Sequence, residues 1–523
     1  MRSRLRFSLP LSVAALLCCL VGQTAKVQAQ YAGAEPPPEA LAEGFESITA
    51  EQCKNWLNIL AGPGFAGRGT GQPGHVKAAH WVAGKCAEFG LEPLGDADTY
   101  FQMLPMSKLQ VASEQSKLTG PDGLTVPFTD SISLDRFNAE PLVTGNLSFV
   151  GISGAEAKLD NSSDLRGKIV VLSADDAAEG RGIFTLTRQR PAAILQVVDV
   201  LPKSASQLKR GNNRRRTNTT SGFISKAAAE KLLEAVSGEA EWLEIPSEEN
   251  TASVNNTDKS FTMEARVFEE PTSVPNVLAW YPGSDPELAD EYLVIGAHLD
   301  HLGVRGDTVY PGADDNGSGS TAILNIAKAI SQNPVKPKRS ILFMWFAAEE
   351  MGLVGSRHYV ENPILPLDKM IAMLNLDMVG RNEEVPGEPA SENIQTLHLV
   401  GSKKGDPAFH EMILDVNKHV NVTFEYDQEG VFGRSDQINF FRKGASVAFM
   451  FGGFHPDYHR PGDVPEKINY DKIASAAKLF YLAAHEATSH GFYPVPEEED
   501  EQPAKKIEEK AAKPQEAKSG AAK

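Results

Sequence analysis

From about residue 274 onward, short apolar runs alternate with segments that have helical periodicity. The runs have the length and the β-branched or aromatic composition of buried strands, and they lie at residues 292–297, 341–346, 370–376 and 446–451. Residues 320–330 place Ile323, Ile326 and Ile330 on one stripe of a helix. Alternating strands and helices favour a largely parallel sheet, so we predict an α/β fold with helices on both faces.

The part of the chain before this region has a different pattern. Residues 50–60 and 75–89 are typical of amphipathic helices, and the glycine-rich loop 62–74 lies between them. Residues from about 118 to 256 instead contain short β runs, such as 169–172 and 192–198. We therefore predict a separate β-rich module in this stretch.

The N-terminus has the layout of a secretory signal peptide. Arg2, Arg4 and Arg6 precede an apolar run, and Val27-Gln28-Ala29 offers small residues at cleavage-site spacing. The apolar run is shorter than the roughly 20 residues that a membrane helix needs. We expect an exported protein, periplasmic or secreted, with no stable membrane insertion after signal cleavage.

Charge and cysteine content limit the possible partners and metal sites. The formal net charge of −18 argues against a nucleic-acid partner, because phosphate binding depends on clustered Lys and Arg. Cys53 and Cys86 are the two cysteines beyond the leader, and they could form a disulfide or remain buried thiols. Two thiolates cannot build a cysteine zinc cage, so any metal must bind His and carboxylates.

Metal-binding residue types follow each predicted strand. Functional groups in open α/β sheets gather past the carboxyl ends of strands. The strand-end residues here, in chain order, are His298 with Asp300, Glu349 with Glu350, Asp377, and His455 with Tyr458 and His459. A glycine-rich loop, residues 312–319, adds Asp314 and Asp315.

Each of these residues alone has a purely structural explanation, such as a buried core histidine, a turn or a helix cap. Together, carboxylates converging at one sheet edge would repel one another, so a bound cation is the simpler explanation. Imidazoles with several carboxylates suit zinc, with manganese or cobalt as alternatives. One carboxylate can bridge two ions, and a glutamate that binds no metal is then available as general base.

These motifs resemble the di-zinc exopeptidase family of secreted bacterial leucyl-type aminopeptidases and glutamate carboxypeptidase. The resemblance covers residues from about 50 to 490 and implies the zinc exopeptidase fold with two zinc ions. It implies that one ion binds His298, Asp315 and Asp377, and that the other binds Asp315, Glu350 and His459. It also marks the Asp315–Asn316 bond as a candidate cis peptide.

The same resemblance assigns the remaining site residues. Glu349 matches the general base, and Asp300 matches a carboxylate that orients His298. Tyr458 is placed like a tyrosine that steadies an oxyanion, and Arg434 resembles a group that grips the substrate backbone. A packed tyrosine and a surface arginine are the alternatives for these two. Gln437 departs from relatives, which often have His or an aromatic residue there, and it could touch the rim of the specificity pocket.

The inserted module, which begins its first clear strand after Asp164-Leu165-Arg166-Gly167-Lys168, resembles a protease-associated domain. The predicted organisation is a signal peptide (1–29), an N-terminal part of the peptidase domain (30–117), a protease-associated insertion (118–260), a catalytic zinc peptidase domain (261–492) and a disordered tail (493–523).

The resulting expectation is an exported zinc-dependent aminopeptidase that removes N-terminal residues from peptides by a two-metal, glutamate-base mechanism. A carboxypeptidase with the same metals is the nearest alternative, and it would need cationic groups for the substrate's terminal carboxylate. Glutaminyl cyclases share the fold but use one zinc, which the full ligand set argues against. A receptor-like binding protein is the non-enzymatic alternative. The oligomeric state is not predicted.

Overall fold

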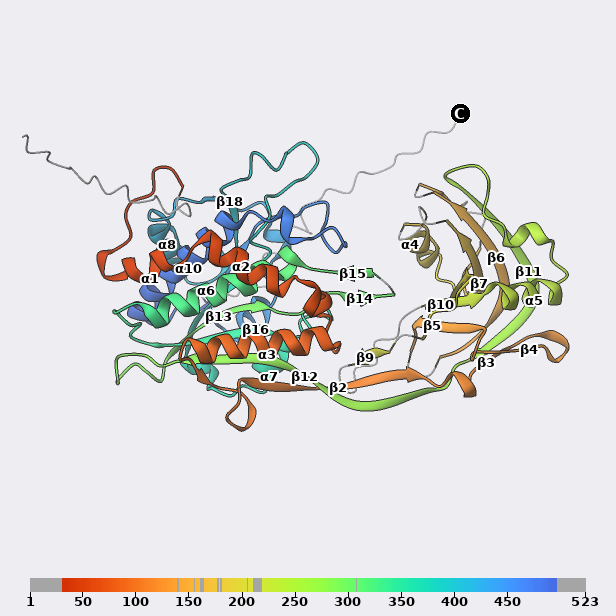
Figure 1. Ribbon diagram of the computed structural model, residues 1–523, viewed down its shortest axis with the longest axis horizontal. Coiled ribbons are helices and arrows are strands. Elements are labelled where there is room, and N and C mark those ends of the chain that lie inside the picture. The colour runs from red at the N-terminus through yellow and green to blue at the C-terminus, as the bar shows by residue number, and fades with distance from the viewer. Residues whose placement is uncertain are drawn as a thin grey trace, which may run out of the picture.

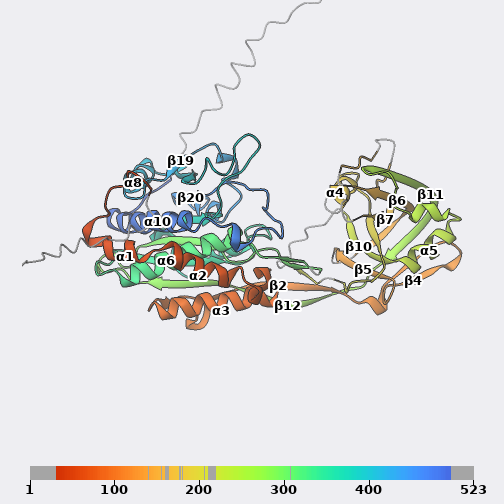
Figure 2. The ribbon, with the colours of Figure 1, turned by 45° about the horizontal axis from the view of Figure 1, so that its top comes forward.

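The computed structural model describes residues 31–495, apart from residues 139–140, 155, 160–163, 176–177, 179–180, 205, 210–218 and 307. The chain forms two lobes that are joined by a long two-stranded ribbon (Figure 1 and Figure 2). The ribbon consists of β2 (Phe101–Val111) and β12 (Val267–Tyr281), which pair antiparallel along the whole of β2. The predicted signal peptide, and the predicted tail beyond residue 495, lie outside the described residues.

The larger lobe is built on a sheet that contains ten strands among the described residues. Nine of them follow the order β19-β18-β20-β17-β13-β16-β12-β2-β9, and β1 pairs with β12. The central strands β20, β17, β13 and β16 run parallel, whereas β18 and β12 join them antiparallel. The strands not yet bounded are β1 (Glu92–Pro93), β9 (Gln207–Lys209), β13 (Tyr292–His298), β16 (Ser340–Phe346), β17 (Met370–Asp377), β18 (Thr396–Val400), β19 (Thr423–Glu425) and β20 (Val447–Phe451).

Helices cover both faces of this sheet, as the sequence predicts. Alternate residues of β13 point to opposite faces, so Leu293 and Ile295 belong to one apolar core and Tyr292 and Val294 to another. The first core includes residues of α1 (Ala42–Ser47), α2 (Ala50–Leu60), α3 (Pro73–Glu88), α6 (Gly319–Gln332), α8 (Pro407–Asn417) and α10 (Tyr470–His490). The second includes residues of α7 (Val354–Glu361) and α9 (Gln437–Phe441). Full burial on both faces explains why the central strands read as continuous apolar runs.

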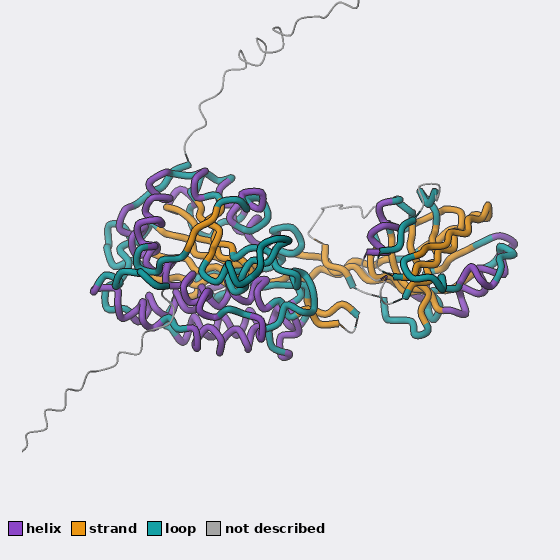
Figure 3. Tube along the Cα trace, turned by 90° about the horizontal axis from the view of Figure 1, so that it is seen from above, coloured by secondary structure: helices purple, strands orange, loops and turns teal. Residues whose placement is uncertain are grey.

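The smaller lobe has its own sheet, in the order β4-β3-β11-β6-β7-β8-β10-β5. Separate apolar clusters line it, one including Leu232 of α5 (Lys226–Ala235) and the other Leu186 of α4 (Arg181–Arg188). Its strands are β3 (Lys117–Thr119), β4 (Thr125–Pro127), β5 (Ile132–Arg136), β6 (Leu142–Ser153), β7 (Ile169–Ala174), β8 (Ala193–Val198), β10 (Thr220–Ser225) and β11 (Thr251–Glu264). Figure 3 shows the two sheets well separated along the molecule. The assignment of this lobe to a protease-associated domain stays a prediction.

Cys53 on α2 and Cys86 on α3 are free thiols, and both are buried in the first core of the larger lobe. Burial raises the pKa of each thiol, so both behave as small apolar side chains. Of the two alternatives that the sequence leaves open, the structure has the unbridged one. No helix in the described part of the chain is both long and apolar enough to cross a membrane.

Candidate metal centre

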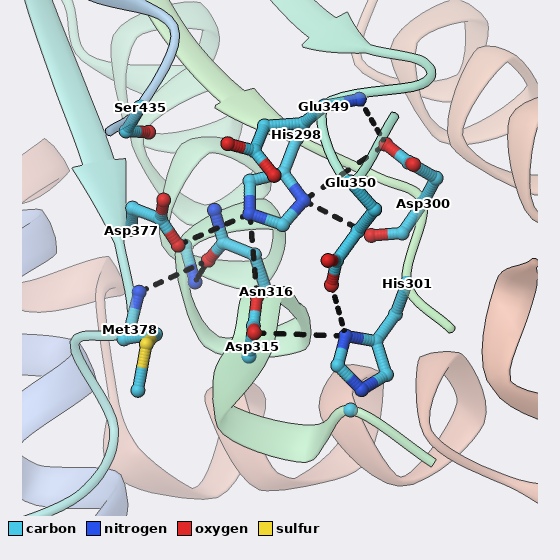
Figure 4. Close-up of polar contacts among 12 residues, drawn as sticks. His298, Asp300, His301, Asp315, Asn316, Glu349, Glu350, Asp377, Met378 and Ser435 are labelled. Atoms are coloured by element: carbon cyan, nitrogen blue, oxygen red, sulfur yellow. Dashed lines mark hydrogen bonds and ion pairs between the residues drawn. The ribbon is translucent and has the colours of Figure 1, made fainter. Parts of the chain in front are cut away.

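The predicted ligands meet at the carboxyl ends of the central parallel strands, and Figure 4 shows His298, Asp315, Glu350 and Asp377 among them. His298 is the last residue of β13 and Asp377 the last of β17, while Glu350 follows β16 and His459 follows β20. Asp315 comes from the loop between α6 and a small hairpin, β14 (Gly303–Arg305) and β15 (Thr308–Tyr310). Parallel strands carry these residues to one edge, as the alternating pattern predicts.

The first donor group contains His298, Asp315 and Asp377. The Nε2 atom of His298 lies 3.3 Å from Oδ1 of Asp315 and 3.1 Å from Oδ1 of Asp377. The Nδ1–H of His298 can donate to the backbone carbonyl of Asp300 at 3.0 Å, which leaves the Nε2 lone pair facing both carboxylates. A proton on Nε2 or a metal cation between these groups would relieve the repulsion among them.

The second donor group shares Asp315 with the first. The Nε2 atom of His459 lies 3.0 Å from Oδ2 of Asp315 and 3.3 Å from Oε2 of Glu350. Asp315 thus presents one carboxylate oxygen to each group, which is the arrangement that a bridging ligand requires.

A dense hydrogen-bond network holds the loop that carries Asp315. The Asp315–Asn316 peptide is cis, as the resemblance implies. The Asn316 side chain donates to the carbonyl of Leu376 at 2.9 Å, and the Asp463 carboxylate accepts from the backbone N–H of Asp315 at 3.1 Å. Asp314 faces elsewhere, because its Oδ1 accepts from the N–H of Gly380 at 2.6 Å. The loop therefore directs Asp315 alone of the two aspartates toward the site.

Glu349 and Asp300 lie beside the first donor group. The carboxylate of Asp300 accepts hydrogen bonds from the backbone N–H of Glu349 at 3.1 Å and from the hydroxyl of Thr70 at 2.7 Å. Its nearer oxygen is 3.9 Å from Nδ1 of His298, so the imidazole is closer to the Asp300 backbone carbonyl than to the carboxylate. Asp300 therefore positions the turn that carries Glu349 as well as lying next to His298.

The electrostatics of the site favour a bound cation. Burial alone would lower the pKa of His298, but Asp377 and Glu349 raise it well above the ordinary value. Burial likewise opposes protonation of His459, yet hydrogen bonds to Asp315 and Glu350 raise its pKa to about 10. Both imidazoles thus take up protons where a metal ion would otherwise neutralise the carboxylates. Nitrogen and oxygen donors without a thiolate are the set that zinc accepts.

Comparison with known proteins supports this interpretation. Residues 276–484, which contain all five predicted ligands and Glu349, match the sequence profile of Peptidase family M28. This part of the chain is similar to that family. The leupeptin-inactivating enzyme 1 of Streptomyces exfoliatus is 34% identical to this chain over 179 residues, which cover 34% of this chain and 36% of that protein. The probable leucine aminopeptidase 1 of Trichophyton verrucosum is 34% identical over 253 residues, which cover 46% of this chain and 64% of that protein.

The chain spans between 36% and 64% of the length of the curated relatives it matches. A solved zinc aminopeptidase from Bacillus subtilis aligns with 85% of this chain and 98% of its own, with a TM-score of 0.52 and 20% identity. At that identity the likeness is one of fold, and it extends beyond the residues that match the family profile.

Arg434 and Tyr458, the two predicted substrate-side residues, contact each other. A terminal guanidinium nitrogen of Arg434 donates to the hydroxyl of Tyr458 at 3.2 Å, and the Tyr458 ring stacks on His459 with centroids 3.9 Å apart. Arg434 is exposed and also lies over the ring of Phe454. Gln437, in contrast, is fully buried and accepts from the Asn375 amide at 3.0 Å. It lies within the fold, away from the solvent-exposed rim.

Sequence reasoning missed two residues that the fold brings to this site. His301 follows Asp300 directly, and its Nδ1 is 2.8 Å from Oε1 of Glu350. Its spacing of three from His298 on the same strand end was the available signal. Arg68, at the centre of the glycine-rich loop, is fully buried beneath the site and donates to four backbone carbonyls. No local sequence pattern around Arg68 predicts that its side chain is buried.

Asp436 provides a test of how the stability of the metal-free protein depends on pH. Burial raises its pKa to about 7, above the value of about 4 expected for the unfolded chain. The folded state therefore binds this proton more tightly, and stability is lost as pH rises from about 4 through about 7. Replacing Asp436 with Asn should remove that loss. The stability advantage of the variant over wild type should grow by about 2–3 kcal/mol between pH 5 and pH 8.

The measurement is the urea midpoint of metal-free wild type and Asp436→Asn at both pH values. The exposed Glu384, changed to Gln, serves as the control for the loss of one carboxylate. An equal difference between Asp436→Asn and wild type at pH 5 and pH 8 would show that Asp436 titrates normally.

Proposed function

We propose that this chain is an exported zinc-dependent aminopeptidase that releases N-terminal residues from peptides. The observation that carries the proposal is Asp315, which offers one oxygen to the His298–Asp377 pair and the other to the Glu350–His459 pair. This arrangement supports two ions held by five side chains, with Glu349 next to them. The family match and the names of the relatives agree with peptidase chemistry.

His298, Asp315 and Asp377 would hold one zinc ion, and Asp315, Glu350 and His459 the other. When bound, the ions supply Lewis acidity, which polarises a carbonyl and lowers the pKa of water. Glu349 would accept a proton from the attacking water and deliver it to the leaving amine. In the metal-free site, burial and the nearby acids Asp436 and Asp377 raise the pKa of Glu349 well above its ordinary value, against the opposing effect of His298. Such a carboxyl group can carry a proton between two reaction steps.

Arg434 and Tyr458 would contact substrate on the open side of the site. The guanidinium holds the Tyr458 hydroxyl, and Tyr458 stacks on His459, so the hydroxyl is kept close to the reacting centre. We assign Tyr458 to stabilising the developing oxyanion and Arg434 to the substrate backbone. Asp300 would keep both the imidazole of His298 and the backbone of Glu349 in place.

The choice of aminopeptidase over carboxypeptidase rests on the relatives, seven of which are named as leucine aminopeptidases or probable leucine aminopeptidases. A carboxypeptidase would hold a terminal carboxylate with cations, whereas an aminopeptidase would hold a free ammonium group at the substrate N-terminus. The smaller lobe, as a protease-associated domain, would restrict access to long substrates.

The test is a screen of short peptides that differ only at their ends. Peptides with a free N-terminus and an amidated C-terminus should be hydrolysed from the N-terminus, and N-acetylated peptides with a free C-terminus should remain intact. Product identity by mass spectrometry decides between the two. Cleavage of the acetylated set at its C-terminal bond would instead establish the carboxypeptidase alternative.

A further inference from the structure

His301 is an imidazole near the proposed metal centre that the five-ligand scheme leaves without a role. It is fully buried, and its Nδ1 lies 2.8 Å from Oε1 of Glu350 and 3.7 Å from Oδ2 of Asp315. The ligand atoms of His301, Asp315 and Glu350 all lie within 4.8 Å of one another. Figure 4 shows the His301 ring directed at both carboxylates.

The same two carboxylates also face His459, from the other side. Oδ2 of Asp315 faces both imidazoles. Oε1 of Glu350 faces His301, and Oε2 of Glu350 faces His459. The rings of His301 and His459 are 5.8 Å apart and meet edge to face. His301 and His459 thus contact the same two carboxylates, and with them they offer the four nitrogen and oxygen donors that a tetrahedral zinc ion takes.

The fold fixes His301 in this position. Its backbone N–H donates to the carbonyl of Arg68 at 3.3 Å, and the ring packs against Gly312. A Cβ on Gly312 would lie 2.5 Å from two ring carbons of His301, and Gly312 has a φ of +59°. Only glycine suits that position, so the loop that carries Asp315 is shaped around the imidazole.

We infer that His301 is a fourth side-chain ligand of the ion held by Asp315, Glu350 and His459. The inference rests on the proposed function, because it presupposes zinc at this centre. It makes the two ions unequal, with three side-chain ligands from His298, Asp315 and Asp377 for one and four for the other. The ion with four side-chain ligands should then bind more tightly than the ion with three. The difference in affinity between the two sites depends on His301.

A zinc competition titration with a chromophoric chelator tests this without measuring activity. Wild type should show two dissociation constants. His301→Ala should weaken the tighter one by at least tenfold, since even outer partners of metal ligands are worth about 10–100-fold in affinity. The weaker constant should stay within about threefold of wild type, and buried His485→Ala on α10 should change neither.

A second variant separates coordination from a simple hydrogen bond. If His301 only donates to Glu350, His301→Gln can replace that bond and should bind both ions like wild type, which would overturn the inference. If His301 is a ligand, His301→Gln should lose the tight site as His301→Ala does. The visible absorption of the Co²⁺ form should weaken or shift in both variants, and circular dichroism establishes that each one is folded.

The two proposals fail in different ways. Wild type that binds two ions and cleaves free N-termini, with both constants unaffected by His301→Ala, would contradict only the role of His301. Wild type that binds no zinc in the titration would contradict the zinc site itself and the proposed function with it.

Discussion

Replacing Glu349 with Gln should lower kcat by about 10²–10⁴-fold, the range that a positioned general base contributes, and should leave zinc binding intact. Gln has the shape of Glu but cannot accept and return a proton. None of the donor distances that define the two groups involves the Glu349 side chain. The expected result is therefore a folded, metal-loaded protein with little turnover of aminoacyl anilides.

Two parallel measurements make this result specific. Zinc content of Glu349→Gln should equal that of wild type, which separates lost proton transfer from lost metal. The exposed Glu384→Gln should keep wild-type kcat and serves as the matched control for loss of one carboxylate. Near wild-type hydrolysis by Glu349→Gln would remove Glu349 from the mechanism.

Replacing Arg68 with Met should destabilise the larger lobe by about 3–5 kcal/mol, the cost usually found when one partner of a buried charged network is removed. The guanidinium donates to the carbonyls of Leu60, Leu299, Pro311 and Gly312, over distances of 2.7–2.9 Å. Burial lowers its pKa to about 10, which still leaves it charged at neutral pH. Methionine fills the space but can donate to none of these four carbonyls.

Urea unfolding of metal-free protein provides the measurement for Arg68. Arg68→Lys should recover less than half of the lost stability, because one ammonium cannot reproduce the planar fork that reaches three chain segments. The exposed Arg442→Met on the same lobe should stay within about 0.5 kcal/mol of wild type. A loss below about 1 kcal/mol for Arg68→Met would show that the four hydrogen bonds of the guanidinium contribute little to stability.

The sequence predicted the central sheet well because burial on both faces leaves a strong signal. The predicted strand at residues 292–297 corresponds to β13 (Tyr292–His298), and the run at 341–346 corresponds to β16 (Ser340–Phe346). The flanking ribbon was not predicted. Strands β2 and β12 are buried only in part, so their residues carry no continuous apolar run. Pairing between segments about 160 residues apart is a property of the tertiary fold.

The candidate site, too, could be predicted only in part. Ligands at strand ends could be predicted, because a parallel sheet places all its carboxyl ends at one edge. His301 and Arg68 could not be assigned from sequence, since their roles depend on where the glycine-rich loop and the 312–319 loop cross. The side chain of Arg68 is held by carbonyls from three separate segments. No local periodicity in the sequence predicts these contacts.

The most direct measurement is the zinc content of purified, active protein by inductively coupled plasma mass spectrometry. The shared carboxylate of Asp315, with donor groups on both sides, predicts close to two zinc ions per chain. Asp315→Ala should then lose both ions together with activity, because each group loses a ligand. Fully active wild type with one ion or none per chain would contradict the two-metal centre.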